Sequence, residues 1–218
     1  MRTPWVPLMP LGSTWRWRLL AALLVVSTSL LPGSRVDAAE PSEQGPPAEQ
    51  EQLVSAALLT AAQARRATGF RARLSADLMA GEQGRSCYGK KAEWTCDGWF
   101  VSDENASPVP IGVAITVTGS AGDAQAALAN LAHRATDRSG SRILESTTNS
   151  LVTYGTGLAV GPDLTPAVSV TVQRIQGTFM IMGSCQVEKR RLQLSALRRC
   201  AVRLQTAQAR QAAGVSQA

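Results

Sequence analysis

Four cysteines, all placed after an export-type leader, point to a fold that is closed by covalent bridges. Basic residues precede an apolar run at 19–31, and small residues up to Ala38 form a cleavage site. The run has 13 residues, whereas a helix that crosses a bilayer needs roughly 20. We therefore predict a signal peptide at 1–38, a secreted or periplasmic product of the cell envelope, and no stable membrane insertion after cleavage.

An even number of cysteines in an exported chain predicts disulfide bonds. The four residues are Cys87, Cys96, Cys185 and Cys200, and they permit three pairings. We favour Cys87–Cys96 with Cys185–Cys200, because each of these bridges closes a local unit and stabilises it by roughly 3 kcal/mol. A zinc site would use close Cys-x-x-Cys pairs, which this sequence lacks. We therefore expect no metal site and no cofactor.

The rest of the chain has the length of one domain. Residues 39–52 contain prolines and no large apolar side chain, so they cannot bury enough surface to offset the entropy of ordering. They are predicted to form a disordered linker. Residues 53–211 are predicted to form a single domain, and 212–218 a disordered tail.

The hydrophobic periodicity predicts an α+β domain in which helices cover an antiparallel sheet. Thr60 and Gln63 have the spacing of a capping box, and Gly69 suits a left-handed cap, so a helix is expected over 61–68. Alternating apolar residues predict strands, and apolar residues at helical spacing predict helices. The further strands are expected at 70–78, 86–101 (a hairpin), 113–117, 143–154 (a pair), 168–172 and 178–182, and the further helices at 123–136 and 187–209.

Aromatic residues concentrate around the first cysteine pair, where Trp94 and Trp99 lie on the predicted hairpin. Aromatic rings on a rigid hairpin are suited to stacking on a sugar or filling a partner's pocket. The alternative, which we favour, is that they fill the core of a sheet that is otherwise poor in aromatics.

Basic residues dominate the last predicted helix, among them Arg198, Arg199 and Arg203. Such a helix suits an acidic protein, anionic lipid or a cell-wall polyanion. The alternative is an ordinary solvated face opposite the leucine stripe, and this is the interpretation that we favour. Because no aromatic platform is interleaved with the bases, we expect no nucleic-acid partner.

No catalytic residue is predicted. His133 is the single histidine, and the common hydrolase signatures are missing. Gly155 and Gly157 superficially resemble a phosphate loop, but prolines follow them instead of a helix that would direct its amides at the anion. We interpret these glycines as part of a flexible connection between strands.

Residues 58–69, Leu-Leu-Thr-Ala-Ala-Gln-Ala-Arg-Arg-Ala-Thr-Gly, resemble the opening helix of the extracytoplasmic sensor domains of mycobacterial PknH-type kinases and related secreted actinobacterial proteins. The later order of predicted elements is similar too. The resemblance implies a disulfide-bonded α+β module with a sheet-lined cleft that senses or binds ligands rather than catalyses. It transfers no binding residue to this chain.

These observations favour an exported, non-enzymatic binding module that recognises a protein or a cell-wall component. The arginine- and alanine-rich, lysine-poor composition suggests a bacterial source. The residues proposed for binding are Trp94, Trp99, Arg198, Arg199 and Arg203. Two alternatives stay open: an inhibitor or immunity protein for a secreted toxin or lytic enzyme, and an enzyme with an unfamiliar site near His133.

Overall fold

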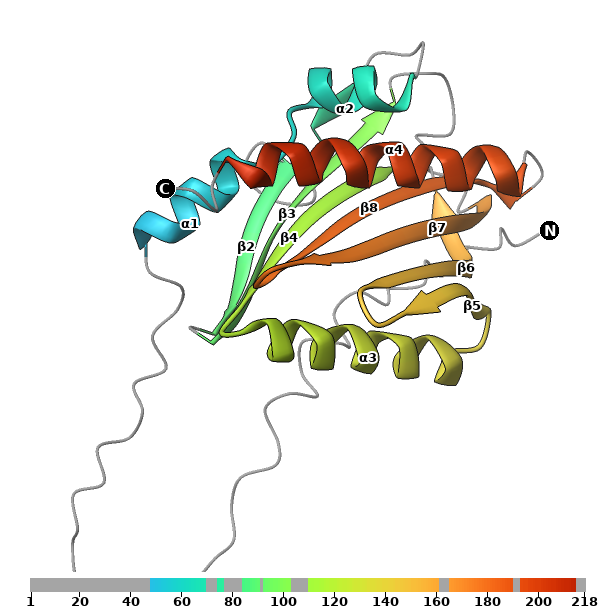
Figure 1. Ribbon diagram of the computed structural model, residues 1–218. Helices are drawn as coiled ribbons and strands as arrows, with labels where there is room; N and C mark the ends of the chain where they lie inside the picture. Colours follow the sequence, from blue (N-terminus) through green and yellow to red (C-terminus); the bar gives the residue numbers. More distant parts are fainter. Residues whose placement is uncertain are drawn as a thin grey trace, which may run out of the picture. The chain divides into compact units, whose positions relative to one another are not determined.

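The structure is a computed structural model (Figure 1). It describes residues 48–69, 74–76, 84–90, 92–102, 110–160, 165–189 and 193–214. The predicted signal peptide and the first part of the predicted linker lie outside these residues.

One eight-stranded antiparallel sheet organises the described chain, with strand order β1-β3-β4-β8-β7-β6-β5. β2 pairs with the same edge of β3 as β1 does, further along that strand. The predicted α+β class is therefore confirmed. The strands are β1 Leu74–Ala76, β2 Arg85–Lys90, β3 Glu93–Ser102, β4 Ile111–Thr118, β5 Ser141–Thr147, β6 Ser150–Val160, β7 Thr165–Gln176 and β8 Phe179–Glu188.

The two faces of the sheet differ in chemistry because side chains alternate along a strand. In β4, Ile111, Val113 and Ile115 belong to the main core, whereas Ala114 and Thr116 point to the opposite face. β7 repeats the pattern, with buried valines alternating with serine, threonine and glutamine. In β4 and in residues 168–173 of β7, the first face is packed with branched apolar residues, and the second face is lined by small and polar ones.

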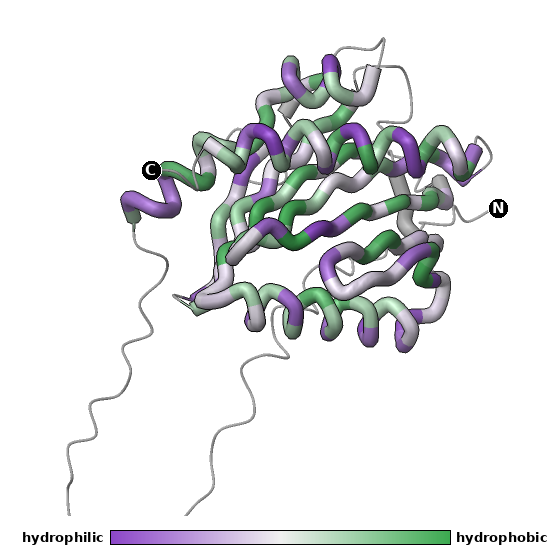
Figure 2. The backbone as a smooth tube through the Cα atoms, in the orientation of Figure 1, coloured by the Kyte–Doolittle hydropathy of each residue, from purple (hydrophilic) through white to green (hydrophobic). Residues whose placement is uncertain are grey.

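Helix α4, Leu194–Ala213, covers the first face, which we call the α4 face (Figure 1). Its leucine stripe, with Leu197, Ala201 and Leu204, is buried in the main core, as the heptad spacing predicts. In Figure 2, hydrophilic and hydrophobic residues alternate along α3 and α4, as they do in helices that pack one side on a sheet. The short helices α1, Ala48–Ala56, and α2, Ala61–Thr68, join the same core.

Helix α3, Ala121–Asp137, lies on the opposite side, which we call the α3 face (Figure 1). It contacts the sheet through a small second core around Leu128, Leu151 and Met180. The helix begins at Ala121 and not at the predicted Asp123, because the Ser120 hydroxyl accepts the Asp123 N–H at 3.1 Å and caps the first turn. This second core covers only part of the face.

Both favoured disulfides are present. Cys87 and Cys96 lie directly opposite each other in the β2–β3 pair, with Cα atoms 4.1 Å apart. Cys185 of β8 is joined to Cys200 of α4 with a Cα separation of 6.1 Å. The first bridge closes the hairpin, and the second fastens α4 to the sheet.

The amino-terminal helices are held by polar contacts. Thr60 and Gln63 form the predicted capping box, and Gly69 adopts the left-handed conformation with φ 74° at the end of α2. Gln208 of α4 binds the segment between α1 and α2. Its side-chain oxygen accepts the Leu59 N–H at 3.0 Å, and its amide donates to the Ala57 carbonyl at 2.8 Å.

The structure differs from the predicted boundaries in several places. α1 begins at Ala48, inside the predicted linker, with Glu49 and Glu51 in its first turn, where acids favour helix formation. α4 begins at Leu194 and not near residue 187, because β8 continues to Glu188. It extends past the predicted domain end, since Ala212 is buried in the main core.

The two glycines expected in a flexible connection lie inside β6, which pairs with β5 and β7. That interpretation was therefore wrong for Gly155 and Gly157. The register of both pairings includes an irregularity, one beside Leu144 in β5 and one at Gly157 in β6.

Candidate functional site: a cleft under helix α3

Two hollows lie between α3 and the part of the sheet that the second core leaves open. One encloses about 630 Å³ and the other about 420 Å³, volumes in the range of small-molecule sites. Leu131, Arg134 and Gln173 line both of them. The hollows therefore adjoin each other along these three residues, and we call the two together the cleft.

Small and hydroxyl-bearing residues make the floor of the cleft. Ser169 and Thr171 of β7 and Thr153 of β6 line the larger hollow. A Cβ added at Gly155 would come 3.0 Å from the Ser169 hydroxyl oxygen, so the glycine keeps that group open to the cleft. These residues are the polar ones in the alternating pattern of each strand, and α3 lies over them.

The larger hollow carries two positive charges, and we call it the basic hollow. Arg134 lies in the last turn of α3, Arg138 is the residue that follows the end of the helix, and both line this hollow. Its described lining contains no acidic residue. Asp137, the acid next to them in the sequence, instead contacts His133 Nδ1 at 3.1 Å.

The smaller hollow holds aromatic, sulfur-containing and acidic side chains, and we call it the aromatic hollow. It is lined by Tyr88, Glu93, Asp97, Trp99, Met180 and Met182, among others. The six-membered ring of Trp99 covers Gly112 of β4, where an added Cβ would meet three ring carbons at 2.6 to 2.9 Å. Only a glycine at this position lets the ring lie flat against the strand.

Asp97 organises the polar side of the aromatic hollow. It accepts hydrogen bonds from the Ser86 hydroxyl at 2.8 Å and from the Tyr88 hydroxyl at 3.3 Å. Partial burial raises the pKa of the Tyr88 phenol above its ordinary value of 10.0, and the negative charge and hydrogen bond of Asp97 raise it further. Tyr88 therefore stays neutral and donates to Asp97 throughout the physiological range.

This arrangement predicts the titration of Tyr88. The chain has two tyrosines, Tyr88 and Tyr154, and the ultraviolet absorbance of tyrosinate reports both, so a Tyr88→Phe variant identifies the signal of Tyr88. Its midpoint is expected above 10, and Asp97→Asn is expected to lower it. Because folding favours the neutral phenol, the contribution to stability is lost as the pH rises through the folded-state pKa. A midpoint at or below 10 would contradict the contact.

The structure separates the two tryptophans that the sequence placed together. Trp94 is 2% exposed and packs in the main core, which is the alternative that we favour from the sequence. Trp99 lies on the α3 face and lines the aromatic hollow. Of the two tryptophans, Trp99 is therefore the one that lines a hollow.

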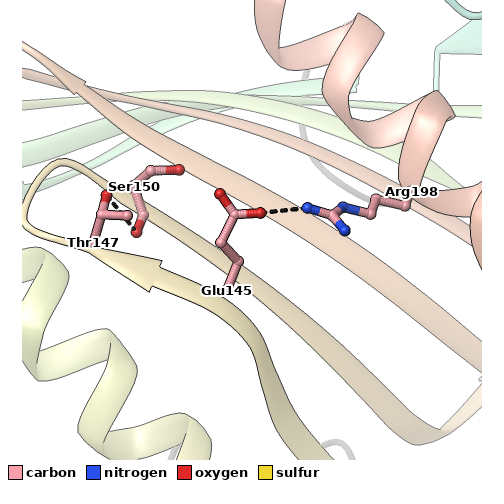
Figure 3. A network of polar contacts seen from close by, with 4 residues as sticks. All are labelled: Glu145, Thr147, Ser150 and Arg198. Atoms are coloured by element: carbon pink, nitrogen blue, oxygen red, sulfur yellow. Dashed lines mark hydrogen bonds and ion pairs between the residues drawn. The ribbon is translucent and has the colours of Figure 1, made fainter.

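The three arginines of α4 lie away from the cleft, on the helix that covers the α4 face. Arg198 forms an ion pair with Glu145 of β5 (Figure 3). Both side chains are nearly half exposed, and such pairs contribute about 0 to 1 kcal/mol. Arg199 and Arg203 are exposed.

His133 is in α3, as predicted, but it is not among the residues that line the cleft. Its side chain is 75% exposed and pairs with Asp137. Within the described residues, no three His, Cys, Asp or Glu side chains gather as a metal site would require. No described helix is both long enough and apolar enough to span a membrane.

Sequence reasoning missed Arg134, Arg138 and the polar floor. The sequence predicts a helix over 123–136 and a strand at 168–172, but no binding role is assigned to either. The sequence shows that these arginines and the alternate residues of the strand are polar. It does not show that they face each other, because that depends on how α3 packs on the sheet.

No protein-family model and no curated protein sequence matches this chain. Among solved structures, the chain is similar to the extracellular domain of PknH from Mycobacterium tuberculosis, with 10% sequence identity and a TM-score of 0.39. The match covers 77% of this chain and 99% of that domain. The weak resemblance predicted from residues 58–69 and the element order is thus confirmed, and a likeness at this TM-score carries no argument about function.

Proposed function

We propose that this protein is an exported binding module whose cleft under α3 holds a small, elongated polar ligand, a fragment of a cell-wall glycan. The observation that carries the proposal is the cleft itself. Its floor offers hydroxyl groups, and its smaller half offers the Trp99 ring beside the carboxylates of Glu93 and Asp97. A flat ring next to hydrogen-bond acceptors suits a sugar, which presents apolar C–H groups on its face and hydroxyls at its edge.

The described surface favours a small ligand over a protein partner. Leu53 and Tyr88 are the large apolar side chains that stand exposed among the described residues. A protein interface usually buries aromatic and aliphatic anchors at its centre. The inhibitor or immunity interpretation has no such cluster to support it in the described part of the chain.

Export is supported by the leader and by the two closed disulfides, which are typical of proteins that fold in an oxidising compartment. An enzyme site near His133 has no support, because this histidine lies outside the cleft lining and pairs with Asp137.

The test uses the emission of Trp99. The purified protein is titrated with the soluble disaccharide of N-acetylglucosamine and N-acetylmuramic acid, and a saturable change in tryptophan fluorescence is expected. A Trp94→Phe variant should keep this change, whereas Trp99→Phe should lose it and weaken binding about tenfold or more, in line with the energy of an aromatic anchor. The proposal is wrong if the sugar leaves the emission of the parent protein and of Trp94→Phe unaltered and calorimetry detects no heat of binding.

Gly112→Ala gives an independent check, because the added methyl group would displace the Trp99 ring from its seat. It should weaken the sugar while Trp99 itself is retained. Normal binding by this variant would show that the position of the ring is irrelevant.

A further inference from the structure

We propose that the basic hollow binds an oxyanion carried by the sugar, a carboxylate or a phosphate, and that Arg134 and Arg138 grip it together. This inference rests on the proposed function, since it assigns the chemistry of one half of the same cleft. It adds the ligand's charge and the direction in which the ligand lies.

The first argument is electrostatic. Arg134 and Arg138 line the same hollow, and like charges that lie close together repel each other. Here the pair faces a hollow whose described lining holds no acid, and within the described residues neither guanidinium forms an ion pair or hydrogen bond. An anion bound between them would neutralise both charges.

The second argument is the composition of the opposite wall. Ser169 and Thr153 supply hydroxyls across from the two arginines, and Thr171 lies beside them with its hydroxyl in a 3.0 Å hydrogen bond to Ser184. Gln173 lies at the junction of the hollows. Guanidinium groups donate in a planar fork that matches carboxylate and phosphate oxygens, and hydroxyls complete the set of donors. This is a pairing of groups suited to an anion rather than to a neutral sugar edge.

The third argument is the polarity of the whole cleft. Glu93 and Asp97 line only the aromatic hollow and Arg138 lines only the basic one, while Arg134 lines both. A ligand with an anionic group at one end is repelled by the first half and attracted by the second. The geometry therefore orients it with a neutral ring on Trp99 and the charged group beside Arg138.

The experiment compares sugars that differ in charge. The neutral disaccharide of two N-acetylglucosamine units is matched against the disaccharide with N-acetylmuramic acid, which carries an added lactyl carboxylate. N-acetylglucosamine 6-phosphate, compared with N-acetylglucosamine, tests phosphate as the source of the oxyanion. At least one anionic sugar should bind about tenfold more tightly than its neutral counterpart, as expected of charge-assisted hydrogen bonds, and added salt should reduce that advantage.

Variants locate the effect. Arg138→Gln should remove most of the preference for the anion while leaving the affinity for the neutral sugar nearly unchanged. Arg134→Gln, whose side chain lines both hollows, should also reduce the preference. Arg199→Gln, on the helix of the opposite face, is the matched control and should bind like the parent protein. Equal binding of neutral and anionic sugars that still alters Trp99 emission would overturn this inference and leave the proposed function standing. Loss of the preference in Arg199→Gln alone would place the anion site on α4 and would also overturn it.

Discussion

Replacing Gly183 by alanine is expected to destabilise the protein by about 3 kcal/mol or more, at the upper end of overpacking substitutions. An added Cβ would lie 2.4 Å from the Gln205 backbone nitrogen and 2.7 Å from the Ala201 carbonyl oxygen. These are backbone atoms of α4 and cannot rotate away, so the helix itself would have to move off β8. Urea unfolding followed by circular dichroism measures the effect.

Gly122→Ala is the matched control. Gly122 lies in the first turn of α3, and the nearest atom to its added Cβ is the Ser120 hydroxyl oxygen at 3.6 Å, an ordinary contact. Alanine favours a helix over glycine by up to about 1 kcal/mol, so this variant should be as stable as the parent or slightly more so. If Gly183→Ala matched it, α4 would not lie against β8 at this point.

The second large effect is expected at Gln208, which is fully buried. Gln208→Ala removes both hydrogen bonds to the segment between α1 and α2 and leaves the Leu59 N–H and the Ala57 carbonyl without this partner. An unsatisfied buried polar group costs about 1–3 kcal/mol. The combined loss is therefore expected to be about 3 kcal/mol, measured by the same urea unfolding.

Two further variants separate hydrogen bonding from packing. Gln211→Ala, whose side chain contacts Gln63 at the exposed surface with a 3.4 Å hydrogen bond, should cost less than about 0.5 kcal/mol. Gln208→Glu keeps the size but loses the donor to the Ala57 carbonyl unless the new carboxyl is protonated. Relative to the parent, its stability should recover as the pH falls through the raised pKa of that carboxyl. A pH-independent difference would show that packing alone matters there.

Much of the fold is predictable because it follows local patterns. The alternation in β4 and β7, the capping box at Thr60 and the leucine stripe of α4 each depend on residues a few positions apart. The sequence also indicates that Gln208 is buried and hydrogen-bonded. It lies four residues after Leu204 on the buried stripe, where a polar side chain needs a hydrogen-bond partner. Its partners, however, lie about 150 positions away in the sequence.

The candidate site is only half predictable. Trp94 and Trp99 are five residues apart on one strand, so the period of two already places them on opposite faces, and they could not have formed one surface together. The position of α4 decides which of the two tryptophans points into the core. The charge of the cleft depends on α3 crossing the sheet, which brings Arg134 opposite β7.

The two bridges join cysteines that are immediate neighbours in sequence order, the first with the second and the third with the fourth. If the amino end of the chain meets an oxidant first, the thiols arrive one after another. The second and the fourth thiol each find their native partner as the thiol that arrived just before them. Sequential oxidation thus yields the correct bonds directly, with no wrong bond that thiol exchange would have to reshuffle. Maturation of this protein should accordingly proceed without help from a disulfide isomerase.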